Sequence, residues 1–169
     1  LWVKGPWVTQ EYFERPEANA EDFEDGWLKT GDVVTVDEEG YVKIVDRAKD
    51  VIKSGGEWIS SVELENALMA VDDVAEATVI GVPHERWQER PVAFVVPSEG
   101  ADADALKEAV LETIEAEYPK WWVPDDVLFI EEVPKTATGK FDKKVLREEY
   151  ADESLVEGKV PDEAAPEDE

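Results

Sequence analysis

Apolar residues recur along the chain in short runs of strand length, separated by turn residues. Such runs, rich in β-branched and aromatic residues, are typical of strands. The runs predicted as strands are 27–36, 41–45, 75–82, 92–96 and 127–130. Asp37–Gly40 separates the first two runs and has the composition of a turn, so 41–45 is predicted to return beside 27–36.

Three other segments have the spacing of amphipathic helices. The first begins at Ser60–Glu63, which has the pattern of a capping box. The second, Asp104–Tyr118, ends at Pro119, and only Glu117 interrupts its apolar face. The third follows Asp142, a typical capping residue. The residues predicted to form the apolar stripes of these helices are Leu64, Leu68 and Val71; Leu106, Ala109, Val110, Thr113 and Ile114; and Val145 and Leu146.

These elements predict an α+β fold in three regions. Residues 1–48 are β-rich but too few to enclose a core, so we expect them to complete a larger domain that precedes them. Leu1–Lys4 lacks an initiator methionine and enters strand-like sequence at once, which suggests a cut inside a longer protein. A connector at 46–53 leads into a small α+β domain at 49–150, and the acidic, aperiodic segment 151–169 is predicted to be disordered.

The charge of the chain is strongly negative. It has 43 acidic and 17 basic residues, a net charge of −26, and the acidic residues are spread along the sequence rather than gathered in one block. Since the screening length falls to about 3 Å at 1 M salt, self-repulsion of such a surface is suppressed in a salt-saturated cytoplasm. The composition therefore predicts a halophilic source, and it argues against unaided binding to nucleic acid or to an anionic membrane.

Composition also excludes several kinds of site. The chain has no cysteine and one histidine, so disulfides, thiolate metal sites and imidazole-rich zinc sites are excluded, and we predict no metal site. His84 is expected to be a loop residue without a catalytic role. No apolar run approaches the roughly 18 residues of a membrane span, and no signal segment opens the chain, so we expect a cytoplasmic protein.

The segment Pro134–Lys144 carries the most chemical information. It places Lys140 after a Thr/Gly-rich loop, expected to be mobile, just ahead of the last predicted helix. A cation presented in this way can stabilise negative charge that develops on a phosphate. The phosphate-binding P-loop is excluded, because Pro134 and Phe141 stand where that motif needs a glycine and a Ser or Thr.

Three segments resemble motifs of the adenylate-forming enzymes, which include acyl-CoA synthetases, luciferases and peptide-synthetase adenylation domains. Pro134–Lys144 resembles the C-terminal lysine motif, Trp27–Asp32 the Thr-Gly-Asp motif, and Asp46–Ile59 the segment between the two domains. They occur in the family's order across about residues 1–150. The resemblance is greatest to medium- and long-chain fatty acyl-CoA ligases, and it implies that 49–150 is the small, mobile C-terminal domain of this fold, a short sheet flanked by helices.

The resemblance also implies roles for individual residues. Asp32 would bind the ribose hydroxyls of ATP and Arg47 would contact the nucleotide. Lys49 would be the hinge about which the small domain rotates, and Lys49, Lys53 and Trp58 would contact the nucleotide or the acyl-adenylate. The family often has glycine at the position of Asp46, although its fatty-acid members commonly depart from this.

The family reaction would use the small domain in two half-reactions, between which it rotates about Lys49. Lys140 would be catalytic in forming acyl-AMP from a fatty acid and ATP. The loop that borders the tunnel for the CoA thiol would consist of Ser54, Gly55, Gly56 and Glu57. ATP, CoA and Mg²⁺ would take part, with the Mg²⁺ ligands outside this chain, and the chain alone would be inactive.

Plainer interpretations remain beside each of these. Asp32 could be a turn residue, the paired glycines a tight turn, and Arg47, Lys49 and Lys53 a solvated basic stretch. Trp58 could be a core or interface aromatic, and Lys140 another surface lysine. At the level of function, the alternatives are a ligase for an aryl or short branched acid and a non-catalytic acidic interaction domain. The sequence leaves the oligomeric state open.

Overall fold

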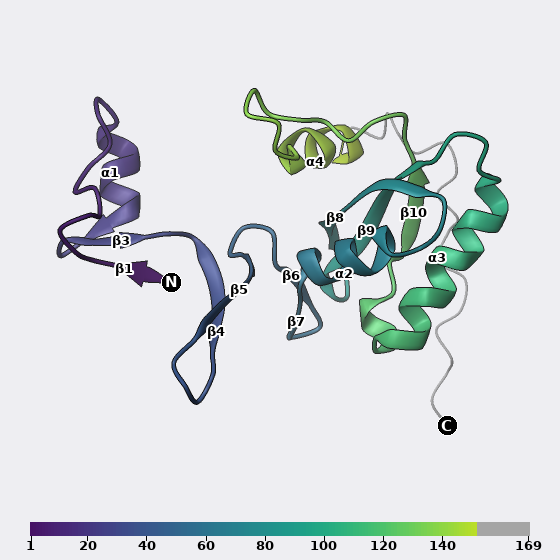
Figure 1. Cartoon of the computed structure of the whole chain (residues 1–169), viewed down its shortest axis with the longest axis horizontal. Helices are drawn as coiled ribbons and strands as arrows, with labels where there is room; N and C mark the ends of the chain where they lie inside the picture. The colour runs from purple at the N-terminus through teal and green to yellow at the C-terminus, as the bar shows by residue number, and fades with distance from the viewer. Residues whose placement is uncertain (152–169) are drawn as a thin grey trace.

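The computed structural model describes residues 1–151. In Figure 1 the first five strands and one helix lie at the left, and a larger α+β body that contains the remaining elements lies at the right. The predicted acidic tail, apart from Ala151, lies outside the described residues. The α+β fold class is confirmed.

The N-terminal part is built from short strands. Its elements are β1 (Trp2–Val3), α1 (Pro16–Asp22), β2 (Phe23–Glu24), β3 (Trp27–Lys29), β4 (Asp32–Val36) and β5 (Val42–Arg47). The order β1-β3-β2 forms one antiparallel sheet, and β4 and β5 form a separate hairpin.

Three features of this part differ from the expectation. The single strand predicted at 27–36 is broken into β3 and β4, which belong to different sheets, because Gly31 takes a φ of +72° between them. The helix α1 was missed, although Pro16 at its first turn is a recognised helix-start signal. The connector is also shorter than predicted, since β5 continues to Arg47 and the next strand begins at Ile52.

The C-terminal body consists of one sheet and the helices that cover it. Its elements are β6 (Ile52–Ser54), β7 (Glu57–Ile59), α2 (Ser61–Met69), β8 (Val74–His84), β9 (Gln88–Pro97), α3 (Ala103–Glu117), a 3₁₀ turn η1 (Lys120–Trp122), β10 (Asp126–Phe129) and α4 (Lys143–Ala151). The strand β9 lies at the centre, antiparallel to β8 on one side and parallel to β10 on the other. The β6–β7 hairpin joins the sheet where Ser54 pairs with Gln88.

Apolar side chains are buried on both faces of this sheet. On one face, α2 and α3 pack through Leu64, Leu68, Val110 and Ile114 against alternate residues of β8 and β9. On the other face, Ile80, Val92 and Phe94 pack against Val133 and against Leu146 of α4. Burial on both faces explains why β8 and β9 are nearly continuous apolar runs rather than alternating ones.

The predicted caps hold the helix starts. The Ser60 side chain accepts a hydrogen bond from the Glu63 amide at 3.2 Å, and Asp142 Oδ1 accepts one from the Lys144 amide at 3.2 Å. Asp102, two residues before the predicted start of α3, caps that helix. The helix predictions were therefore correct to within one or two residues, since cap and apolar stripe agree in each case.

Candidate functional site

Asp32 and Arg47 are neighbours across the β4–β5 hairpin. They are direct partners in its register, and Asp32 Oδ1 lies 3.3 Å from Arg47 Nη1. The Arg47 side chain is 53% exposed. An ion pair this open to solvent contributes little to stability, about 1 kcal/mol at most. The guanidinium therefore remains available to a ligand while the carboxylate orients it.

The turn that follows β5 carries Lys49, whose side chain is exposed. The residue after it, Asp50, is largely buried and pairs with Arg147 of α4, with Oδ1 2.7 Å from Nη2. The same Arg147 nitrogen also donates to the Lys49 carbonyl at 3.4 Å. The downstream side of the turn is thus attached to the α+β body, whereas the Lys49 ammonium faces solvent.

The β6–β7 hairpin presents the predicted loop at its tip. Gly55 and Gly56 take φ values of +60° and +88°, as a tight turn between two adjacent strands requires. Lys53 and Trp58 pair across the hairpin, and both are exposed. Because Trp58 is 61% exposed, its interpretation as a core aromatic is wrong, and it presents its ring beside the Lys53 position.

Residues of β9 and the turn before it support this loop from behind. The Gly55 amide donates to the Trp87 carbonyl at 2.9 Å, and the Trp87 ring lies 3.0 Å from where a Cβ on Gly55 would stand. Arg90 donates to the Ser54 hydroxyl at 3.1 Å and pairs with Asp125 at 2.7 Å. These contacts hold the loop in place from the side of β9.

His84 lies at the end of β8 and stabilises the same turn. Its Nδ1 accepts hydrogen bonds from the amides of Arg86 and Trp87 at 3.1 and 3.2 Å. The Arg86 guanidinium lies 4.6 Å from the Trp87 ring centre, in a cation–π arrangement. The imidazole acts here as a hydrogen-bond acceptor for backbone groups.

Lys140 lies in a closed hairpin. The Thr136 amide donates to the Lys140 carbonyl at 2.7 Å, the Gly139 amide donates to the Thr136 carbonyl at 2.9 Å, and Lys135 and Phe141 form a β-bridge. Gly139 supplies the positive φ of +80° that this turn needs. Lys140 is exposed, and within residues 1–151 the structure records no hydrogen bond or ion pair of its ammonium group. The Thr/Gly-rich loop is thus cross-linked by backbone hydrogen bonds.

The structure separates the Lys140 loop from the β6–β7 hairpin. Figure 1 shows the yellow-green loop before α4 at the top of the view and the β6–β7 hairpin below the centre. The predicted site residues therefore form three groups: Asp32 with Arg47, the 53–58 hairpin, and Lys140. The turn at Lys49 lies between the first two groups in sequence.

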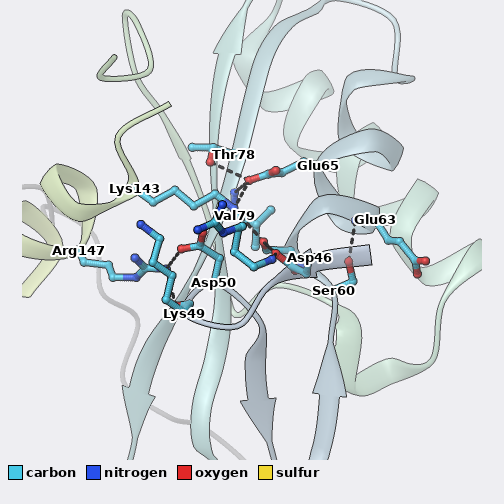
Figure 2. A network of polar contacts seen from close by, with 12 residues as sticks. Asp46, Lys49, Asp50, Ser60, Glu63, Glu65, Thr78, Val79, Lys143 and Arg147 are labelled. Carbon is cyan, nitrogen blue, oxygen red and sulfur yellow. Dashed lines mark hydrogen bonds and ion pairs between the residues drawn. The ribbon is translucent and has the colours of Figure 1, made fainter. Parts of the chain in front are cut away.

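A buried polar network anchors α4 beside this turn (Figure 2). Lys143 Nζ lies 2.7 Å from Glu65 Oε1 and donates to the Ser61 hydroxyl at 2.8 Å. The same Glu65 oxygen accepts from the Thr78 hydroxyl at 2.8 Å and from the Val79 amide at 2.9 Å. The Lys143 and Glu65 side chains are only 12% and 14% exposed. Sequence reasoning missed Lys143, because among neighbouring lysines nothing local marks one as buried.

A shallow hollow is formed beside Arg90 and Asp125, the ion pair that supports the β6–β7 loop. It is lined by Arg90, Glu115, Tyr118, Lys120, Val123, Pro124 and Asp125. Burial raises the pKa of the Tyr118 hydroxyl, and the charges of Glu63 and Glu117 raise it further, so this group stays protonated. The hollow contains none of the predicted site residues.

The described part of the chain has neither a grouping of metal ligands nor a membrane-spanning helix. Across residues 1–151 no three His, Asp or Glu side chains are grouped to hold a metal ion. No helix there is both long and apolar enough to span a membrane.

Comparisons with known proteins agree with this geometry. Residues 63–140 match the family model of the AMP-binding enzyme C-terminal domain. A long-chain-fatty-acid–CoA ligase of Thermus thermophilus is 52% identical over 150 residues, which cover 88% of this chain and 27% of that protein. A 3-methylmercaptopropionyl-CoA ligase of Ruegeria lacuscaerulensis is 49% identical over 152 residues, covering 90% of this chain and 28% of that protein.

A solved structure extends the likeness to three dimensions. ATP-bound MatB from Rhodopseudomonas palustris superposes with a TM-score of 0.79 at 38% identity, covering 89% of this chain and 30% of that chain. The chain thus spans between a quarter and a third of the length of the relatives it matches. Through residues 63–140, it belongs to the AMP-binding enzyme C-terminal domain family.

Proposed function

We propose that this chain is the C-terminal part of a fatty acid–CoA ligase, which forms acyl-AMP from a fatty acid and ATP and then transfers the acyl group to CoA. The observation that carries the proposal is the exposed ammonium of Lys140, in a closed hairpin of a domain of the AMP-binding family. The full-length protein that would contain the chain is called the parent ligase below. Residues 1–48 would complete its large domain and 49–150 would form its small, movable domain.

In the first half-reaction Lys140 would face the α-phosphate and the substrate carboxylate. Negative charge shifts between these oxygens as the acyl–phosphate bond forms and pyrophosphate leaves, so a fixed cation stabilises the transition state more than the ground state. The closed hairpin restricts the backbone from which Lys140 projects. Asp32 would accept hydrogen bonds from the ribose hydroxyls, and Arg47, which it orients, would contact the nucleotide.

In the second half-reaction the small domain would turn about Lys49. Lys140 would withdraw, and the loop of Ser54, Gly55, Gly56 and Glu57 would border the path of the CoA thiol. Lys53 and Trp58, exposed beside one another, would contact the nucleotide or acyl-adenylate. The Lys140 loop and this hairpin lie apart. This separation supports the proposal that the small domain presents a different part of its surface in each of the two steps.

The assignment of the arrangement seen here to the first step is part of the proposal, and the likeness to ATP-bound MatB supports it. Residues 49–150 make up about three fifths of the chain, whereas the superposition on ATP-bound MatB covers 89% of it. That likeness therefore includes residues on both sides of Lys49. We take the described arrangement as that of acyl-AMP formation.

A fatty acid is the preferred substrate because of the likeness to the Thermus ligase. The Ruegeria relative is named for a different acid, 3-methylmercaptopropionate, so a ligase for an acid other than a fatty acid is the alternative. A non-catalytic acidic interaction domain would leave the exposure of Lys140 and the support behind Gly55 without a purpose. The Mg²⁺ that accompanies ATP would be held by residues outside this chain.

The proposal predicts acyl-CoA formation by the parent ligase. Incubated with ATP, Mg²⁺ and CoA, it should convert saturated fatty acids to their CoA thioesters, with AMP and pyrophosphate as co-products, detected by mass spectrometry. Aryl and short branched acids in the same panel test the alternative. The 169-residue chain alone serves as the control and should form none; thioester formation by the chain alone, or none from any acid by the parent ligase, would contradict the proposal.

We further propose a cytoplasmic protein from a halophile, because of the net charge of −26. The midpoint of thermal unfolding should rise by at least about 5 °C between 0.1 and 2 M KCl, as screening relieves the repulsion among carboxylates. Differential scanning calorimetry measures this. Sucrose, which stabilises proteins without screening charge, is the control. A midpoint that does not respond to KCl, or responds no more than to sucrose, would rule out the salt adaptation.

A further inference from the structure

Asp46 is a buried carboxylate just before the proposed hinge. It lies near the end of β5 and is 2% exposed. Its Oδ2 accepts a hydrogen bond from the Ser61 amide at 2.6 Å, and its Oδ1 accepts from the Ser61 hydroxyl at 3.2 Å. Oδ1 also accepts from the Arg47 amide at 2.7 Å. Both carboxylate oxygens are thus occupied, and Asp46 is bonded to a residue beyond Lys49.

A second contact crosses the hinge at the same place. The Ser60 hydroxyl donates to the Val45 carbonyl at 3.0 Å while it caps α2 by accepting from the Glu63 amide. The end of β5 is therefore attached to the start of α2 by two side chains. Asp46 reaches from β5 to Ser61, and Ser60 reaches back to the Val45 carbonyl. Lys49 lies between the two attached segments, so rotation about it moves β5 relative to α2 and strains these contacts.

Ser61, which is bonded to Asp46, also connects this attachment to the Lys140 loop. Ser61 Oγ receives the hydrogen bond from Lys143 Nζ at 2.8 Å and donates toward Asp46. Lys143 begins α4, three residues after Lys140. Figure 2 shows Lys143 and Arg147 reaching from α4 toward the segment that carries Asp46, Lys49 and Asp50, where Arg147 pairs with Asp50. One hydrogen-bond network therefore holds both the end of β5 and the start of α4, which follows the Lys140 loop.

We propose that Asp46 is a positioning residue that holds the domain arrangement of the first half-reaction, and this rests on the proposed function. Glycine, which the resemblance places here in many relatives, has no side chain with which to make the contact. Hydrogen bonds to a charged group are among the stronger ones, because a buried carboxylate that loses them loses its solvation as well. Loss of Asp46 should therefore shift the population toward other arrangements.

The first test measures the arrangement without catalysis. The chain has no cysteine, so Thr35→Cys in β4 and Glu108→Cys in α3, both at exposed positions, would carry the only two spin labels. Pulsed electron resonance at 2 M KCl should give one narrow distance population for the otherwise unchanged chain. Asp46→Ala should broaden it or add a second population. Glu39→Ala, which removes an exposed carboxylate from the same hairpin, is the control and should change nothing.

Folding is checked separately. Circular dichroism reports whether Asp46→Ala keeps its helices; if it does not, Asp46→Asn, which keeps an oxygen acceptor for the Ser61 amide, is used in its place and should broaden the distribution less. Distance distributions of the folded variants that match the unsubstituted chain would overturn the proposal. This outcome is independent of any ligase activity.

The second test uses the parent ligase. Acyl-AMP formation and transfer from supplied acyl-AMP to CoA are measured separately. Asp46→Ala should lower the ratio of the first rate to the second by about tenfold, and Glu39→Ala should leave it unchanged. An equal fall in both rates would indicate a merely structural role and would refute the positioning. If the parent ligase forms no thioester, the proposed function fails while the distance measurement still decides whether Asp46 holds the hinge.

Discussion

Lys140→Ala in the parent ligase is expected to slow acyl-AMP formation by about 10²–10³-fold, the usual effect of removing one preorganised group that stabilises an oxyanion. Transfer from supplied acyl-AMP to CoA should be nearly unchanged. The reason is geometric: the Lys140 loop and the β6–β7 hairpin lie on different parts of the small domain. We therefore expect one step to use Lys140 and the other not to use it. Single-turnover assays of the two half-reactions measure this difference.

Lys144→Ala is the matched control for this experiment. It removes the same charge four residues away, from a side chain that is 80% exposed and whose recorded ion pair within residues 1–151 is an i,i+4 pair with Glu148. It should leave both half-reactions unchanged. A comparable loss of both half-reactions in Lys140→Ala would refute the specific role of Lys140, because it would indicate a general effect on folding or domain docking.

Lys143→Ala is expected to reduce the free energy of unfolding by about 3 kcal/mol. The substitution leaves Glu65, 14% exposed, as a charge without its partner beside β8. Glu65 cannot turn away without releasing the Thr78 hydroxyl and the Val79 amide. Urea unfolding at fixed KCl concentration, followed by circular dichroism, gives the value. Lys144→Ala should change it by no more than about 0.5 kcal/mol.

A second substitution separates lost charge pairing from lost packing. Glu65→Gln keeps an oxygen for Thr78 and Val79 but removes the negative charge. Introduced into Lys143→Ala, it should recover much of the lost stability, since no unpaired charge remains buried. A double variant less stable than Lys143→Ala alone would show that the pair is not the source of the effect.

Elements that depend on local signals could be predicted from the sequence. α2, α3 and α4 each have a capping residue and an apolar stripe, and β8 and β9 are apolar because both faces of the sheet are covered. The break between β3 and β4 was missed because the apolar residues on both sides of Lys29–Asp32 were joined into one strand, although these four non-apolar residues interrupt the run and Gly31 takes a positive φ. Short elements such as α1 have too few residues for periodicity to show.

The candidate site divides in the same way. Lys140, Arg47 and the 53–58 hairpin stand in recognisable local patterns, so their positions could be proposed from sequence. The contacts that hold them could not, because they join distant residues: Asp46 and Ser61 are 15 positions apart, and Ser61 and Lys143 are 82 apart. No local rule distinguishes Lys143, which is buried, from Lys144, which is exposed.

The parallel pairing of β10 with β9 has a consequence for synthesis on the ribosome. A parallel pair needs a crossover, here α3, so the sheet cannot be completed until β10 has emerged. The Lys140 loop and α4 follow still later, and α4 covers Ile80, Val92 and Phe94. A nascent chain stalled near residue 130 would thus expose this apolar face of the sheet, to which chaperones could bind, and would lack Lys140. The synthesis of Lys140 and the covering of that apolar face by α4 therefore both occur late, at the same stage of the folding of this domain.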